Sequence, residues 1–191
     1  MSCSRWTVLV LVVAALGLSL AYGLTSRSDD HLASLRPLQQ RAALAPCPAG
    51  LSADLPDLTL GCLGGGAAVR LRAPGSGVPT LVNVYGSWCG PCKDEMPVLR
   101  QLLAKAAGRV AVVGVDTEDD PSNALHFAIQ VGQHWPAVVD DDKAVLAHYA
   151  KGPPITLFVD ASGRVVHVEV SPLSSLVEAE ALVRKHFGVA L

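Results

Sequence analysis

Residues 80–97 read TLVNVYGSWCGPCKDEMP and carry the strongest structural signal in the chain. Its first part, 80–85, is rich in Val and Leu, which is typical of a buried strand. Two cysteines follow at once, and the segment after them has the apolar spacing of a helix, which predicts a helix over 89–107, closed by Gly108. The apolar positions that carry this periodicity are Met96, Leu99, Leu102 and Leu103.

The two cysteines lie at the junction between the predicted strand and the predicted helix. Cys89 is placed at the helix N-terminus, where free N–H groups and the helix dipole stabilise a thiolate. Cys92 lies one turn further on, within reach of a disulfide with Cys89. Pro91 suits the first turn of a helix, and Gly90 allows a substrate backbone to approach. Because the thiolate is the species that attacks a disulfide, this pattern predicts thiol–disulfide chemistry.

A Cys-x-x-Cys pair is also half of a zinc site, which would need a second pair of ligands. Cys47 and Cys62 do not have the spacing of a zinc knuckle, and the histidines are scattered. We expect neither a metal nor a cofactor. The acidic runs 116–120 and 140–142 lack the Gly and the distal Glu of an EF-hand loop, so we expect them to be solvated loop ends.

The rest of the chain alternates strands and helices. Residues 51–72 suggest short strands broken by turns, with a hairpin turn at 64–66. Later elements are expected as strands at 109–115, 137–139, 155–159 and 165–170, and as helices at 121–132, 143–149 and 174–186. In the last helix, Leu176, Val177, Leu182 and Val183 are expected on or near the inner face. This order predicts an α/β fold with a central mixed sheet flanked by helices.

The N-terminus has a different composition. Residues 6–24 are apolar or small and uncharged, long enough to cross a bilayer, and Arg5 favours a cytoplasmic position for residues 1–5. A cleaved signal peptide is the alternative reading. We expect 25–46 to be a stalk, with a helix within 30–44, and 47–191 to be the folded α/β domain outside the cytoplasmic membrane. The net charge of −2 gives no indication of nucleic-acid binding.

Cys47 and Cys62 are then an exported pair without catalytic spacing. Such a pair is expected to form a structural disulfide, with a second redox relay as the alternative.

Four features together resemble the membrane-anchored thioredoxin-like proteins of the TlpA/ResA type. They are Trp88-Cys89-Gly90-Pro91-Cys92, the continuation 93–97 with Glu95 and Pro97, the inserted strand and helix within 121–142, and Gly152-Pro153-Pro154 ahead of Asp160 and Gly163. The resemblance covers about 55–187 and implies a thioredoxin-like fold.

The resemblance also implies roles for individual residues. Cys89 would be the attacking thiol, and Cys92 would resolve the mixed disulfide from a more buried position. Pro154 would be a cis-proline facing the site. Glu95 would be a buried carboxylate that tunes the cysteines, with a solvated helix glutamate as the alternative reading.

Two positions depart from the family or superfamily pattern. Asn83 stands where classical thioredoxins have an acidic residue, which gives Glu95 more weight. Pro153 has no N–H, so one hydrogen bond that the family makes to its substrate would be missing.

The expected activity is that of a thiol–disulfide oxidoreductase. The resemblance favours a reductant of exported thiols, with the Cys-x-x-Cys-His segment of apocytochrome c as a client and a membrane thiol shuttle of the CcdA or DsbD type as the electron donor. An oxidase that inserts disulfides into exported proteins is the alternative. A binding module without activity and a peroxidase are weaker readings, because both cysteines are intact and the peroxiredoxin motif is absent.

Overall fold

The computed structural model describes residues 34–191, so the predicted membrane segment 6–24 and the first part of the predicted stalk lie outside the described residues. The chain divides into two compact units, Met1–Pro37 and Leu38–Leu191. Residues 34–42 are helical. Within the second unit, the Gln39 side chain donates to Leu63 O and Ala45 N donates to His134 O, so residues 38–46 are tied to the domain. Within 34–191, no helix combines the length and the apolar character that crossing a membrane requires.

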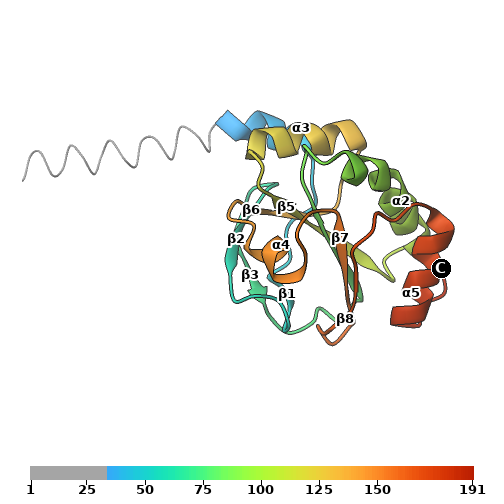
Figure 1. Ribbon diagram of the computed structural model, residues 1–191. Coiled ribbons are helices and arrows are strands. Elements are labelled where there is room, and N and C mark those ends of the chain that lie inside the picture. Colours follow the sequence, from blue (N-terminus) through green and yellow to red (C-terminus); the bar gives the residue numbers. More distant parts are fainter. Residues whose placement is uncertain (1–33) are drawn as a thin grey trace, which may run out of the picture. The chain divides into compact units, whose positions relative to one another are not determined.

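The second unit contains one mixed eight-stranded sheet (Figure 1). Its strands are β1 (Gly50–Ser52), β2 (Thr59–Cys62), β3 (Val69–Arg72), β4 (Thr80–Tyr85), β5 (Ala111–Thr117), β6 (Ala137–Asp140), β7 (Ile155–Val159) and β8 (Val165–Glu169). Its helices are α2 (Gly90–Ala106), α3 (Pro121–Val131), α4 (Ala144–Tyr149) and α5 (Leu176–Phe187). The predicted α/β class and mixed sheet are confirmed.

The strand order is β1-β3-β2-β6-β5-β4-β7-β8. The strand that leads into the cysteines, β4, is central: it pairs parallel with β5 and antiparallel with β7. The glycine-rich segment after β2 joins it to its antiparallel neighbour β3, which confirms the predicted hairpin. β7 and β8 are likewise antiparallel neighbours joined by the short turn 160–163.

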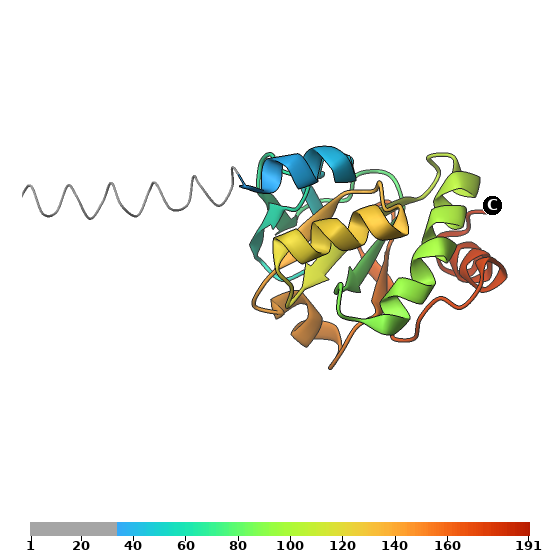
Figure 2. The same cartoon turned by 90° about the horizontal axis from the view of Figure 1, so that it is seen from above.

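The alternation of side chains along β4 separates two cores. Leu81 and Tyr85 pack with α2, α3 and α5, whereas Val82 and Val84 pack in the core that contains α4. Figure 2 looks onto the first face, with α2 and α3 in front of the strands. Asn83 lies between Leu81 and Tyr85 in the alternation, so its amide points toward α2 rather than into the apolar core around α4.

Two predictions are wrong. Val177 is 78% exposed; the inward positions of α5 are Ala179 and Val183, one turn apart, with Leu176 packed against them. The acidic runs are not fully solvated either, because Asp116 and Asp140 are 0% and 1% exposed. Asp140 is buried for a structural reason: its carboxylate accepts N–H groups from Ala144 and Val145 in the first turn of α4.

Candidate active site

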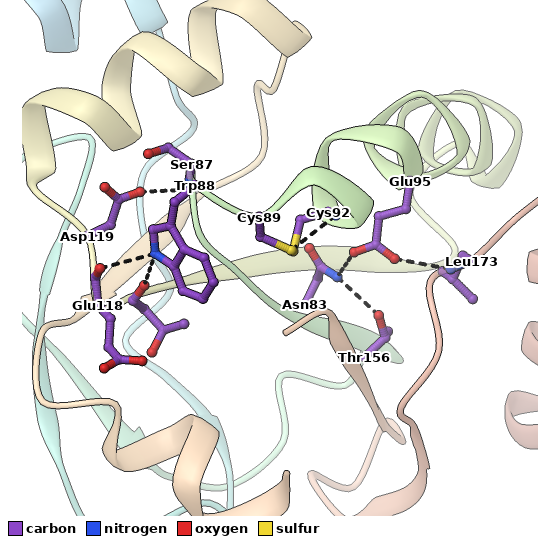
Figure 3. The surroundings of a disulfide bond; sticks show 11 residues. Asn83, Ser87, Trp88, Cys89, Cys92, Glu95, Glu118, Asp119, Thr156 and Leu173 are labelled. Carbon is purple, nitrogen blue, oxygen red and sulfur yellow. Dashed lines mark hydrogen bonds between the residues drawn. A yellow bond between two sulfur atoms is a disulfide. The ribbon is translucent and has the colours of Figure 1, made fainter. Parts of the chain in front are cut away.

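Cys89 and Cys92 form a disulfide at the start of α2, with an S–S distance of 2.00 Å (Figure 3). Cys89 is the N-cap of the helix, with extended backbone angles, and its sulfur accepts from Cys92 N at 3.2 Å. An N–H group aimed at this sulfur would stabilise a thiolate there once the pair is reduced. Cys89 is 5% exposed and Cys92 is 0% exposed, so Cys89 is the more accessible of the two.

Glu95 lies one turn after Cys92 on the same helix and is 1% exposed. Its Oε1 accepts from Asn83 Nδ2 at 2.8 Å, and its Oε2 accepts from Leu173 N at 3.1 Å. Burial raises the pKa of Glu95 to about 7, against the two hydrogen bonds, which lower it. The carboxyl group therefore changes its charge near neutral pH, one helical turn along α2 from Cys92 (Figure 3).

Asn83 is positioned by the sheet. It is the fourth residue of β4, and its register partner on β7 is Thr156, whose Oγ1 accepts from Asn83 Nδ2 at 3.1 Å. The amide thus joins the strand below the site to the carboxylate of the helix above it. The prediction that Glu95 is buried is confirmed, and the solvated alternative is wrong.

Trp88, directly before Cys89, is 55% exposed although its indole N–H is held. The indole Nε1 donates to Thr117 O at the end of β5 at 3.3 Å and to Glu118 O in the turn between β5 and α3 at 3.1 Å. In the same turn, Asp119 Oδ2 accepts from Ser87 N at 2.6 Å. Sequence reasoning missed Asp119 and the Leu173 N–H, because neither contact is local in the chain.

The Pro153–Pro154 peptide bond is cis, as predicted, and it immediately precedes β7, the strand that pairs with β4. Pro153 presents a carbonyl oxygen and no N–H at this position. The predicted difference from the family in substrate hydrogen bonding therefore stays a prediction.

Cys47 and Cys62 form a second disulfide, with an S–S distance of 2.00 Å. It joins the segment before β1 to the end of β2, and it lies outside the cluster around Cys89. Across residues 34–191, no group of three or more His, Cys, Asp or Glu side chains is arranged to hold a metal ion.

The comparisons with known proteins agree on one family. The Redoxin family model matches residues 50–183. The thiol:disulfide interchange protein CycY of Rhizobium leguminosarum bv. viciae is 34% identical over 148 residues, which are 76% of this chain and 72% of that protein. The thiol-disulfide oxidoreductase ResA of Bacillus thuringiensis (strain Al Hakam) is 31% identical over 94 residues, so this match spans 48% of the chain and about half, 53%, of the relative.

Among solved structures, a putative thiol:disulfide interchange protein DsbE from Chlorobium tepidum superposes with a TM-score of 0.58 at 27% identity, covering 73% of this chain and 96% of that one. The family match includes β4, both site cysteines and Glu95. The chain therefore belongs to the Redoxin family and is a thiol–disulfide oxidoreductase similar to ResA, CycY and DsbE.

Proposed function

We propose that Cys89 and Cys92 carry out the exchange and that the chain acts as a reductant of exported protein disulfides. The Cys89 thiolate attacks a client disulfide, a mixed disulfide forms and one client thiolate leaves. The Cys92 thiolate then attacks Cys89 Sγ and releases the second client thiolate. The client gains two electrons and the two protons that Cys89 and Cys92 gave up, and the pair ends as the disulfide.

The observation that carries the reducing direction is the burial of Glu95 next to the cysteine pair. A carboxylate near a thiolate destabilises it by like-charge repulsion, and a less stable reduced form makes the pair a stronger reductant. With a pKa of about 7, Glu95 can also accept the proton that Cys92 must lose before it resolves the mixed disulfide. Asn83 holds the carboxylate in place, Trp88 borders the attacking sulfur, and Pro154 lies at the start of the neighbouring strand.

Trapping tests the assigned roles. In Cys92→Ser, the Cys89 thiolate should attack a client disulfide and stop at the mixed disulfide, which a non-reducing gel detects. Cys89→Ser should give no such adduct. Equal adducts from both variants would remove the distinction between an attacking and a resolving cysteine.

The resemblance to ResA supports one client class, the Cys-x-x-Cys-His segment of apocytochrome c. A synthetic peptide of this pattern, oxidised to its internal disulfide, should be reduced by the dithiol form of the chain. In the alternative function, an oxidase, the disulfide form of the chain would instead oxidise the dithiol peptide. A membrane thiol shuttle of the CcdA or DsbD type would return electrons to the reductant.

The apolar run 6–24 supports a position at the cytoplasmic membrane, with residues 1–5 inside, a single crossing, and a stalk that starts at residue 25 and ends where residues 38–46 join the domain. Membranes from cells that make the full chain should retain it in alkaline carbonate. In intact spheroplasts, an impermeant maleimide should label Cys89 after mild reduction. Release by carbonate would point to a cleaved signal peptide, and absence of labelling would exclude an extracytoplasmic site.

A further inference from the structure

The turn between β5 and α3 holds the two residues that come before Cys89. Asp119 Oδ2 accepts from Ser87 N at 2.6 Å, and the carbonyls of Thr117 and Glu118 accept from the Trp88 indole. Three hydrogen bonds from one short segment thus fix the backbone at position 87 and the ring at position 88. Figure 3 shows Asp119 and Glu118 facing this loop on the side away from Glu95.

The turn is itself anchored at both ends. Asp120 caps α3 by accepting from Ser122 N at 2.8 Å. Glu118 N donates to Asp140 O at 3.3 Å, and the Glu118 carboxylate pairs with Lys143 Nζ at 2.7 Å, at the start of α4. A segment tied to two helices is a rigid support for the loop it contacts.

Asp116 lies beneath this turn as the register partner of Tyr85, the last residue of β4. It is 0% exposed, and neither carboxyl oxygen has a hydrogen-bond partner among residues 34–191. Burial, followed by the charge of Asp119, raises the pKa of Asp116 to about 9. Burial thus favours the protonated form of Asp116, and Asp119 is the carboxyl group that accepts the Ser87 N–H.

The loop that the turn holds is part of the surface around Cys89. The Trp88 ring is 55% exposed, which is unusual for a side chain of this size whose N–H is already bonded. Ser87 lines an open hollow of about 400 Å³ together with Asn123, His126, Phe127 and Gln130 of α3. A polypeptide that brings a disulfide to Cys89 must cover some of this surface, whereas a small disulfide need not.

We propose that Asp119 is a positioning residue for polypeptide clients: by accepting the Ser87 N–H, it holds the Trp88 ring and the edge of the hollow as a fixed docking platform beside Cys89. This inference rests on the proposed exchange function. The platform would bind the polypeptide segments of the client that lie on either side of its disulfide. The sulfur chemistry is unchanged by it, because Asp119 contacts neither cysteine.

The experiment compares two substrates of the dithiol form of the full chain. Insulin serves as the polypeptide disulfide and bis(2-hydroxyethyl) disulfide as the small one, and the second-order rate constant is measured for each. Asp119→Ala should lower the insulin rate by about tenfold, through loss of a charged hydrogen bond that orders the platform, and leave the small-disulfide rate within about twofold. Asp119→Asn retains an acceptor oxygen and should recover most of the insulin rate.

Asp142→Asn is the control, because it removes the same charge from an exposed position in the neighbouring acidic run. If Asp119→Ala does not fold, Asp119→Ser replaces it, since the shorter hydroxyl side chain carries no carboxylate to accept the Ser87 N–H. Asp119→Ser should likewise slow insulin reduction and leave the small-disulfide rate unchanged. Equal loss with both substrates, no loss with insulin, or no recovery in Asp119→Asn would overturn the positioning role.

A wild-type chain that reduces neither substrate would contradict the proposed function itself. That result is distinguishable from failure of the positioning role, in which the wild type is active and the variants do not separate the two substrates.

Discussion

Asn83 Nδ2 donates to Glu95 Oε1 over 2.8 Å, and this bond joins the central strand β4 to the helix that carries both site cysteines. Both residues are almost fully buried. A neutral amide at position 83 donates to the carboxylate, whereas an ionised acid there would repel it. The identity of residue 83 therefore bears directly on the charge state of Glu95.

Replacement of Asn83 by Ala should raise the pKa of Glu95 above its value of about 7, because the Asn83 hydrogen bond lowers it. Loss of the donor should also reduce the free energy of unfolding by about 1–3 kcal/mol, since it leaves a buried acceptor unpaired. Carboxyl ¹³C NMR of Glu95 against pH measures the first effect. Thr156→Val retains the Asn83–Glu95 bond and should shift the pKa less; an equal shift in both variants would contradict the assignment.

Glu95→Gln should change how stability depends on pH. The folded-state pKa is raised from 4.5 to about 7, so between these values the folded chain keeps a proton that the unfolded chain has lost. The free energy of unfolding therefore falls as pH rises from about 4.5 to 7, by at most about 1.4 kcal/mol per pH unit from this group. Urea unfolding across this range should show a flatter profile in Glu95→Gln.

The control for that profile is Asp94→Asn, an exposed carboxyl on the same helix. It should leave the slope unchanged. A Glu95→Gln profile parallel to the wild type would show that Glu95 titrates at its ordinary value.

Asp116→Asn should change the pH dependence of stability in the same direction as Glu95→Gln, over a wider pH range. The pKa of Asp116 is raised from 3.8 to about 9, so its contribution to stability is lost progressively as pH rises between these values. The variant cannot ionise, so it should gain stability relative to the wild type as pH increases from 5 to 8. Thermal unfolding at several pH values measures this, and a constant difference would count against the buried neutral acid.

Removal of the Cys47–Cys62 disulfide should separate stability from activity. The double variant Cys47→Ala/Cys62→Ala should lose about 3 kcal/mol, the loop-entropy value for a loop of this size. Its exchange rate through Cys89 should stay within about twofold of the wild type. Mass spectrometry under mild reductant provides the second readout: reduction of Cys47–Cys62 as readily as Cys89–Cys92 would favour the redox relay instead.

Local pattern was enough to predict much of this molecule. β4 and β7 occupy their predicted ranges because short runs rich in β-branched, other aliphatic and aromatic residues leave little ambiguity about a buried strand. The position of Cys89 at the start of α2 also follows from adjacent residues. The Val177 error has a simple origin: several apolar residues in one helix allow more than one choice of inner face, and contacts with the neighbouring α2 decide between them.

The contacts that tune the site could not be predicted, because they join residues far apart in the chain. Leu173 N reaches Glu95 across 78 positions, and Asp119 reaches Ser87 across 32. Asp116 is buried because it pairs with Tyr85 in the parallel register of β4 and β5. This register cannot be inferred from the acidic run in the sequence. An acidic run in sequence looks solvated until the strand that enters it is known.

The reduction potential of the Cys89–Cys92 couple tests the central claim most directly. It is measured on the full chain by equilibration with glutathione redox buffers, with Cys47–Cys62 followed separately by mass spectrometry. We expect a potential below about −200 mV, in the range of reducing members of this fold. A potential well above about −200 mV, toward the −120 mV of the strongly oxidising members, would contradict the reductant assignment and favour the oxidase.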